Sequence, residues 1–460
     1  MSIKACYMVP HPPMIIDEIG KDDINKIRET YDSYESIARE IGEMEIDTII
    51  VSTPHTKLYS DYFHMLDRSN LSGSFEDFGH KEIHFEESND FELVSKIDEL
   101  CKRDNYPSGI LNDDSYELDH GTMVPLYFIN KYFGDYKLLV IGISGLDYVE
   151  HYKMGRIIKE AVELLDKNVI YIASGDLSHK LQEYGPYGFI EEGPIYDKEI
   201  MDVMSKGEFG RLLEFDPNMV EKAAVCGHKS FIMMAGFLDG IDVKSKFFSH
   251  QDITGVGYGI CSYYPIVEDD SRYFLDSYLL KEKDRLNNIY NNSDSYVLLA
   301  RKTIYEYIKN NKIIDVDGVD KELLENKAGV FVSIHKFNHL RGCIGTISST
   351  TDCIAKEIIN NAISASTKDY RFDHITEDEL DYLEINVDVL LEPEVIIDKN
   401  MLDVKKYGVI VRCGNKRGLL LPDIDGVDTI DEQINIALRK GNISKNDNYI
   451  LERFEVIRHR

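Results

Sequence analysis

The first part of the chain alternates short apolar runs with long stretches in which apolar residues recur at helical spacing. The stretches 22–44 and 151–167 are examples of the helical pattern. Nearly continuous apolar runs are typical of strands buried on both faces of a sheet. The clearest runs lie at residues 3–9, 46–52, 137–143 and 168–174. This alternation predicts an α/β fold with an open, mostly parallel sheet and helices on both faces.

The pattern changes after residue 292. Ser293 is suited to cap a helix at 295–310, and a second helical stretch follows at 352–366. Gly414, Asn415 and Lys416 separate two apolar runs and indicate a hairpin. Strands are predicted at 328–334, 383–390, 408–413 and 418–422. We therefore expect a smaller α+β domain with antiparallel strands.

A charged, Asn-rich segment without Gly or Pro separates the two patterns at residues 269–292. It predicts a polar linker between a first domain at 1–268 and a second at 293–460. Residues 291–460 contain 23 Lys and Arg against 29 Asp and Glu, so most of the excess acidic charge lies in the first part. The shift in charge supports the boundary.

The whole chain of 460 residues has 52 basic and 82 acidic side chains and a formal net charge of -30. Such a charge argues against nucleic-acid and membrane partners. No run approaches the length of a membrane span, and the first residues lack the pattern of a secretory leader, so we expect a cytoplasmic protein. The seven cysteines include no CxxC pair, which argues against a disulfide framework or a zinc knuckle.

Polar side chains follow each of the four predicted strands of the first domain. His11 follows the first strand and lies between two prolines, and His55 follows the second strand directly after a proline. Ser144 follows the third strand, and the sequence SGDLSH at 174–179 follows the fourth. Ligands of open α/β sheets bind at the carboxyl ends of the strands. Either histidine alone fits a structural or solvated role, but their joint placement at the ends of neighbouring strands favours a ligand site.

Two imidazoles with one more donor form the three-ligand set that holds a non-haem Fe(II) and leaves positions open for substrate and dioxygen. The third donor is either Cys226 or Glu221, both in the stretch VEKAAVCGHKS. Cys226 before a glycine also fits a small buried residue, and Glu221 fits a solvated helix residue. The residues leave this choice open.

Asp176 and His179 suit proton transfer, because an unligated imidazole titrates near neutral pH and an Asp can orient it. The alternative is that their segment starts a helix, with Asp176 or Ser178 as the cap. His120 precedes an apolar helical stretch and is either an exposed loop residue or a donor that faces the substrate.

These motifs, in this order, resemble the class III extradiol dioxygenase B-subunit family and its Memo-like relatives over residues 1–268. They are PHPP at 10–13, PH at 54–55, DHGTMVPL at 119–126, SGDLSH at 174–179 and GVGY at 255–258. The resemblance implies Fe(II) on His11, His55 and a third ligand, His179 as acid or base, and His120 near the substrate. Ring-cleaving members have Glu as third ligand, whereas the Cys226 position resembles the Memo-like pattern.

The second domain resembles the AMMECR1 family through LRGCIGT at 340–346, INVDVL at 385–390 and GLLLP at 418–422. The combination of a Memo-like domain with an AMMECR1-like domain resembles gene systems that also include a radical S-adenosylmethionine protein. Such a protein is therefore an expected partner. Within the motif, Arg341 is placed to lower the pKa of Cys343 and to bind an anion. The alternative is a tight turn with Cys343 packed inward.

The leading hypothesis is an iron-dependent, dioxygenase-like oxidoreductase for a phenolic or other chelating small molecule, with the AMMECR1-like domain recognising substrate or partner. Another divalent metal or copper is the alternative cofactor. The competing hypothesis is a metal-binding redox adaptor without turnover that works with the radical S-adenosylmethionine protein. A hydrolase built on Cys343 or a serine has less support, since no GxSxG motif is present and the sequence assigns no histidine partner to Cys343. Each of these hypotheses is compatible with a protein that forms a homo-oligomer.

Overall fold

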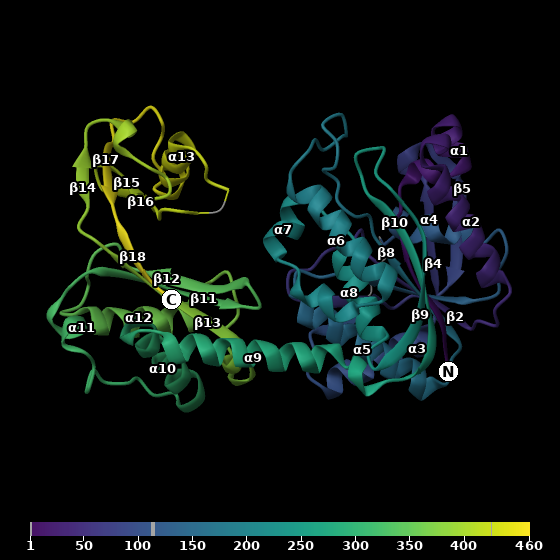
Figure 1. The fold of residues 1–460 in the computed structure, drawn as a ribbon, viewed down its shortest axis with the longest axis horizontal. Coiled ribbons are helices and arrows are strands. Elements are labelled where there is room, and N and C mark those ends of the chain that lie inside the picture. The colour runs from purple at the N-terminus through teal and green to yellow at the C-terminus, as the bar shows by residue number, and fades with distance from the viewer. Residues whose placement is uncertain (1, 112–115, 425) are drawn as a thin grey trace. The chain divides into compact units, whose positions relative to one another are not determined.

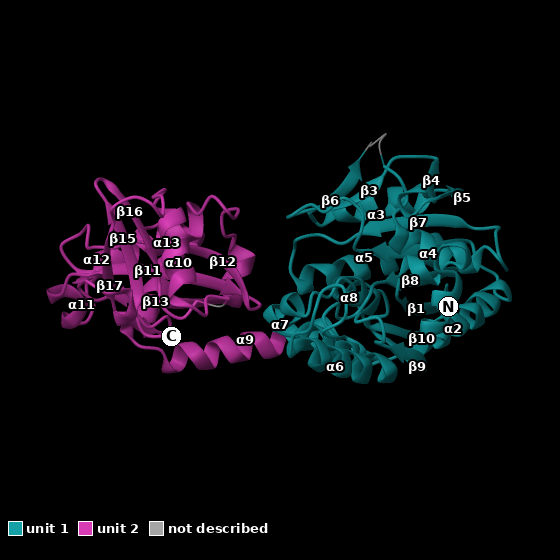
Figure 2. Ribbon diagram, turned by 90° about the horizontal axis from the view of Figure 1, so that it is seen from above, with its two compact units in different colours: residues 1–279 teal, residues 280–460 magenta. Residues whose placement is uncertain are grey.

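The computed structural model of the protein describes residues 2–111, 116–424 and 426–460. The chain forms two compact units, Met1–Leu279 and Leu280–Arg460, coloured separately in Figure 2. The segment predicted as a polar linker contains η5 (Asp270–Arg272) and the long helix α9 (Phe274–Asn292).

The first unit is built on a six-stranded sheet in the order β7-β2-β8-β1-β10-β9. Its strands are β1 (Ile3–Val9), β2 (Thr48–Thr53), β7 (Lys137–Gly142), β8 (Val169–Ser174), β9 (Ile241–Gln251) and β10 (Tyr258–Glu268). The first four are the four predicted runs, and they pair in parallel. β10 and β9 continue the sheet in antiparallel orientation. The predicted α/β class with a mostly parallel sheet is confirmed.

Helices cover both faces of this sheet (Figure 1). On one face, alternate side chains such as Tyr7 and Val51 share a core with α2 (Arg28–Gly42) and α4 (His120–Ile129). On the other face, Tyr171 contacts Phe237 of α8 (His228–Phe237), with ring centroids 5.0 Å apart. Helix α8 packs in turn on α5 (Tyr148–Leu165).

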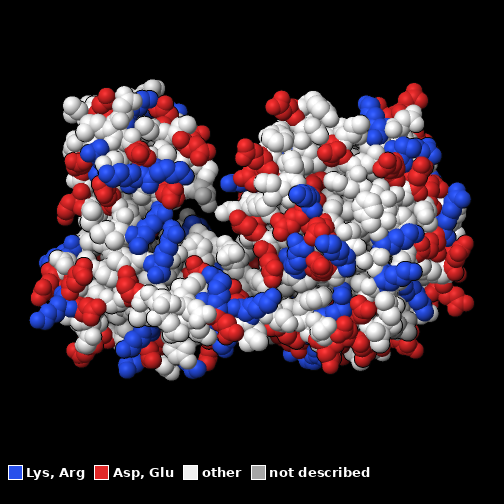
Figure 3. All heavy atoms as spheres, in the orientation of Figure 1, with Lys and Arg blue, Asp and Glu red and all other residues white. Residues whose placement is uncertain are grey.

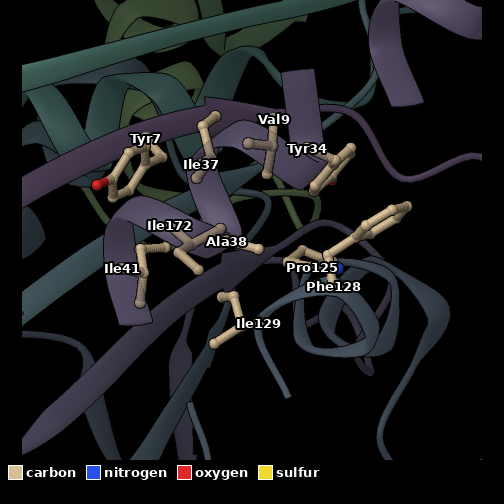
Figure 4. Close-up of a pocket in the computed structure, with 10 residues that line it drawn as sticks. All are labelled: Tyr7, Val9, Tyr34, Ile37, Ala38, Ile41, Pro125, Phe128, Ile129 and Ile172. Carbon is tan, nitrogen blue, oxygen red and sulfur yellow. The ribbon is translucent and has the colours of Figure 1, made fainter. Parts of the chain in front are cut away.

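The space between α2, α4 and the sheet contains an apolar cavity of about 10 Å³, whose ten lining residues are shown in Figure 4. Its volume is at the lower limit for one water molecule, and its lining is apolar. This cavity is a packing defect of the core and is not a ligand site.

The remaining elements of the first unit lie outside the main sheet. Two small sheets pair β3 (Phe63–Leu66) with β6 (Ser108–Leu111) and β4 (Asn70–Phe75) with β5 (His80–Ser88). The helices are η1 (Pro13–Ile15), α1 (Asp17–Gly20), η2 (Lys21–Ile27), η3 (Glu76–Phe78), α3 (Phe91–Arg103), α6 (Glu192–Lys206), η4 (Phe209–Glu214) and α7 (Pro217–Lys222).

The strand order corrects one expectation. β1 and β2, which precede His11 and His55, are not neighbours, because β8 lies between them. The loop after β8, which begins at Gly175, is therefore central among the three loops and lies between the two that carry the histidines.

The second unit contains two four-stranded sheets, and its strands within each sheet pair in antiparallel fashion, as predicted. One sheet has the order β12-β11-β13-β18 and the other β14-β17-β15-β16. The strands are β11 (Gly329–Lys336), β12 (His339–Gly345), β13 (Leu383–Leu390), β14 (Glu394–Ile396), β15 (Gly408–Cys413), β16 (Lys416–Leu420), β17 (Ile450–Phe454) and β18 (Val456–His459).

Helices pack on these sheets as an α+β domain requires. α10 (Ser295–Asn310) and α12 (Ile354–Thr367) share a core with the first sheet, and α13 (Ile430–Lys440) with the second. Short helices are α11 (Lys321–Glu325), η6 (Glu377–Tyr382) and η7 (Lys399–Met401). The cap of α10 is Asp294 and not Ser293, because the Asp294 carboxylate accepts from the amides of Tyr296 and Val297.

Within the described residues, no helix is both long and apolar enough to cross a membrane. Basic and acidic side chains are interspersed on the face of the molecule seen in Figure 3.

Candidate metal centre

Three potential metal ligands converge at the carboxyl edge of the parallel strands. The Nε2 atoms of His11 and His55 are 2.9 Å apart, and the Sγ atom of Cys226 is 3.5 Å from Nε2 of His11. One donor atom from each residue lies within 4.8 Å of the others. Among the described residues, this is the one group of three or more His, Cys, Asp or Glu side chains with such spacing.

A serine at the end of β8 determines which nitrogen of His11 carries the proton. The Ser174 hydroxyl donates to the carbonyl of Gly121 at 2.5 Å, so its oxygen must accept from His11 Nδ1, 2.9 Å away. His11 is therefore protonated on Nδ1, and its Nε2 lone pair faces the other two donor atoms. A carbonyl or hydroxyl partner behind a ligating imidazole is a common feature of metal sites.

The loop after β8 is joined to the loop that carries Cys226. The Asp176 carboxylate accepts from the His11 amide at 2.8 Å, and the Asp176 amide donates to the Cys226 sulfur at 3.1 Å. The two loops meet through facing glycines, since a Cβ atom on Gly175 would lie 2.1 Å from the Cα of Gly227. Only glycine at both positions allows this approach, which holds the sulfur beside the imidazole.

His120 lies against the two ligand histidines. It is the first residue of α4, and its ring centroid is 4.1 Å from that of His55 and 5.3 Å from that of His11. The preceding residue, Asp119, caps the helix by accepting from the Thr122 amide. The cap fixes the start of the helix, so the half-buried imidazole of His120 faces the centre and is not an exposed loop residue.

His179 reaches the centre from the loop after β8. Its Nδ1 donates to the carbonyl of Ala224, a residue held in the left-handed region at φ 53°. Its Nε2 is therefore unprotonated in the neutral ring and lies 3.9 Å from the Asp176 carboxylate. The loop does not start a helix, because the next helix is α6, which begins at Glu192, so the capping alternative is wrong.

The protonation states suit metal binding. Burial, with the neighbouring histidines, holds the pKa of His11 well below its ordinary value. His55 is exposed as a residue, but its ring packs against those of His11 and His120, and the hydration lost there lowers its pKa to about 4. Both imidazoles are therefore neutral ligands. Burial raises the pKa of Asp176 to about 6. Burial and then the Asp176 charge raise the pKa of the Cys226 thiol, and a bound cation would reverse this effect by stabilising the thiolate.

The alternative third ligand lies outside the cluster. Glu221 is exposed on α7 and is absent from the group of convergent donors, which contains Cys226 instead. His228, two residues after the cysteine, is buried with both ring nitrogens engaged, by the Tyr196 hydroxyl and the Leu212 carbonyl. Geometry thus selects Cys226 from the two candidates.

Some residues around the centre carried no usable signal in the sequence. Phe78 contacts the ring of His120 from η3, and Tyr187 contacts the ring of His179 from the loop before α6. Neither follows a predicted strand, so the criterion that selected the histidines could not find them. Ala224 was equally hidden, because a left-handed alanine has no sequence signature.

Ser144, at the end of the third predicted strand, serves the local loop. Its amide donates to His151, and its carbonyl accepts from the ammonium group of Lys229 at 2.8 Å. The ammonium also donates to the carbonyl of Leu146. This half-buried lysine, three residues after Cys226, holds the loop after β7 against the start of α8.

Burial lowers the pKa of Lys229 to about 8. The unfolded chain, with an ordinary lysine pKa of about 10.4, then binds more protons than the folded chain between these two values. We therefore expect the contribution of Lys229 to the free energy of unfolding to rise by roughly 2–3 kcal/mol from pH 8 to pH 10.5. Urea unfolding of wild type and of Lys229→Met at several pH values in this range gives the contribution as the difference between their free energies of unfolding. If the free energy of unfolding changed equally with pH in the two proteins, the prediction would be wrong.

The second unit corrects the expectation for Arg341. Its guanidinium donates to the Glu379 carboxylate and to the carbonyls of Asp373 and His374, so it holds a loop and does not activate the thiol. Burial raises the pKa of Cys343, where a lowered value was expected. The thiol accepts from the hydroxyl of Ser333 at 3.3 Å.

Another arginine near that cysteine, Arg371, comes from the loop after α12, and its guanidinium donates to the Cys343 carbonyl at 3.4 Å. Arg371 pairs with Asp369 at 2.7 Å, and the same carboxylate accepts from the Cys343 amide. This arrangement fixes the backbone of β12 and leaves a protonated, half-buried thiol at neutral pH. It does not supply the activated nucleophile that a cysteine hydrolase needs.

Comparisons with known proteins agree with this architecture. Residues 5–261 match the family model described as the catalytic LigB subunit of aromatic ring-opening dioxygenase, and residues 297–459 match the AMMECR1 model. A protein of Clostridium acetobutylicum is 41% identical over the full length of both chains. A protein of Thermotoga maritima is 47% identical over 36% of this chain and 97% of its own.

Two solved structures resemble parts of the chain. An uncharacterized protein from Pyrococcus horikoshii is 31% identical and covers 35% of this chain and 88% of its own, with a TM-score of 0.32. An uncharacterized protein from Escherichia coli is 14% identical and covers 56% of this chain and 99% of its own, with a TM-score of 0.41.

Proposed function

The chain belongs to the family of catalytic LigB subunits of aromatic ring-opening dioxygenases, and from this premise we propose that its first unit is an iron-dependent oxidoreductase for a phenolic or similar chelating small molecule. The convergence of His11, His55 and Cys226 carries this proposal. The AMMECR1 unit would recognise the substrate or a partner protein.

The donor set fits a transition metal. Two neutral imidazoles and a sulfur suit Fe(II), another divalent transition metal or copper, whereas Mg²⁺ and Ca²⁺ prefer oxygen ligands. Nε2 of His11, Nε2 of His55 and Sγ of Cys226 would hold the ion. When bound, the ion would polarise the phenolic oxygens and exchange electrons with dioxygen.

The chain's own residues would bind the substrate and move its protons. His11 is buried whereas His55 is exposed, so the centre is open on the His55 side. The neutral ring of His179, which donates from Nδ1, has a free lone pair on Nε2 and would take the proton of a phenolic hydroxyl at the centre. Asp176, 3.9 Å away, would stabilise the imidazolium that forms. His120, beside His55, would hydrogen-bond the bound oxygen atoms.

This proposal predicts oxygen consumption with at least one member of a catechol panel, under reducing conditions with added Fe(II). His179→Gln should lower the rate by roughly 10²- to 10⁴-fold, the usual contribution of a positioned base, while metal binding persists. An oxygen electrode measures the rate. His84→Gln, which changes an exposed residue of β5, is the matched control and should leave the rate unchanged.

The second candidate is a metal-binding redox adaptor without turnover that works with a radical S-adenosylmethionine protein. The observation that favours it is the sulfur of Cys226 where ring-cleaving enzymes have a carboxylate, because a thiolate is readily oxidised. Oxygen consumption separates the two proposals. If no catechol supports uptake by the iron-loaded protein, the oxidoreductase proposal is wrong and the adaptor is favoured.

A further inference from the structure

Two exposed aromatic side chains stand beside the candidate centre and have no part in the steps above. The ring of Phe78 lies edge-to-face with that of His120 at 5.6 Å, and the ring of Tyr187 lies edge-to-face with that of His179 at 5.2 Å. Phe78 is 39% exposed and Tyr187 is 60% exposed. Single exposed aromatics are common on proteins, but these two each contact a histidine that flanks the metal ligands.

Each ring adjoins the centre through one histidine. Phe78 contacts His120, whose ring centroid lies 4.1 Å from that of the ligand His55. Tyr187 contacts His179, whose Nε2 lies 3.9 Å from the Asp176 carboxylate. The imidazole nitrogens of these histidines can bind hydroxyl groups, and the two aromatic rings offer apolar faces beside them.

Both rings are held in place by their own segments. Phe78 ends η3, its ring contacts the buried ring of Phe75 at 6.0 Å, and Gly79 follows at φ 83° to turn the chain. Such support keeps Phe78 at the surface when burial would be more favourable. A fixed, exposed aromatic ring next to polar groups is typical of ligand sites.

The segment of Tyr187 is fixed in a similar way. Gly188 follows it at φ 74° and donates to the carbonyl of Gly185. The Tyr184 hydroxyl donates to the carbonyl of Ile253, which anchors the same loop to the segment before β10. Tyr187 therefore projects from a loop that is held three residues before it and one residue after it.

We propose that Phe78 and Tyr187 are positioning residues that contact the flat ring of the substrate while its adjacent hydroxyls reach the centre. This inference rests on the proposed function and extends it, because it selects planar aromatic diols over saturated ones. Aromatic pairs with this geometry contribute enough to change affinity by roughly 3- to 10-fold per ring. The two rings would therefore act on binding and on choice of substrate.

The chain contains no tryptophan, so a single introduced tryptophan reports on its own surroundings. Phe78→Trp and Tyr187→Trp keep an aromatic ring at each position, and Phe247→Trp is the matched control on β9, where the native ring is 51% exposed. Catechol is titrated into each full-length, Fe(II)-loaded variant without oxygen. We expect catechol to quench the tryptophan fluorescence of the Phe78→Trp and Tyr187→Trp variants saturably, and to leave the fluorescence of the Phe247→Trp control unquenched.

Cyclohexane-1,2-diol is the matched probe, since it has two adjacent hydroxyls without a flat ring, and we expect it to bind at least about 10-fold more weakly. Equal response to both probes, or equal quenching in all three variants, would overturn the inference. If wild type consumes oxygen with catechol while neither reporter responds, the inference fails and the proposed function stands. Saturable quenching without oxygen uptake supports the inference and contradicts the proposed function.

Truncation gives a kinetic test. Phe78→Leu and Tyr187→Leu should each raise KM for a consumed catechol roughly 3- to 10-fold with little change in kcat. Tyr187→Phe retains the ring and should behave as wild type. A fall in kcat at unchanged KM would show that these side chains act on the chemistry and not on binding, and would overturn the inference.

Discussion

His11→Ala and His55→Ala are each expected to remove Fe(II) binding from the full-length protein. Groups that merely support metal ligands change affinity by about 10- to 100-fold, so loss of a ligand itself should cost more than about 100-fold. Two donor atoms remain in each variant, and two cannot complete the three-ligand set. Metal content after equilibrium dialysis without oxygen measures the effect.

The control for these variants is His84→Ala, which removes an exposed imidazole on β5 and should bind the wild-type amount of metal. Cys226→Ser tests the third ligand, since a hydroxyl is a poor substitute for a thiolate toward a transition metal. Full metal binding by both histidine variants would refute the assignment of the centre.

Gly175→Ala is expected to damage the centre without changing any donor atom. The added methyl group would lie 2.1 Å from the Cα of Gly227, so the loops after β8 and before α8 must separate. Overpacking of this kind costs about 1–3 kcal/mol, and more when the contact is with backbone. Separation would also move the Cys226 sulfur from the imidazole of His11, now 3.5 Å away, and weaken metal binding.

Thermal unfolding and metal dialysis measure the two effects of this substitution together. Gly134→Ala is the matched control, because the space around that glycine is open and its φ is ordinary. It should change the free energy of unfolding by less than about 0.5 kcal/mol. An unchanged melting temperature and metal affinity for Gly175→Ala would show that the two loops do not depend on this contact.

The sequence was sufficient to predict the four parallel strands, because each is a nearly continuous apolar run. It also predicted that His11 and His55 would share one edge of the sheet, since parallel strands end on the same side. It did not predict β9 or β10. Lys244 and Lys246 interrupt the apolar pattern of β9, and β10 contains Gly259 and Pro265, which are unfavourable in strands.

The order of the strands and the contacts between loops were beyond the reach of sequence patterns. Nothing in the sequence places β8 between β1 and β2, or sets Gly175 against Gly227, because both depend on packing between distant segments. Arg341 shows the same limit, since its partner Glu379 lies 38 residues further along the chain. Its charge suggested a role in activating Cys343 that the ion pair excludes.

The donor atoms of the centre come from parts of the chain that are far apart: 44 residues separate His11 from His55, and 215 separate His11 from Cys226. An unfolded chain rarely brings such residues together, because closing long loops is entropically unfavourable. A metal ion held by all three therefore binds the folded first unit almost exclusively. By mass action, ion at 100 times its dissociation constant adds about 2.7 kcal/mol to the free energy of unfolding. Metal supply would thus raise the folded population of this unit, in addition to its part in the chemistry.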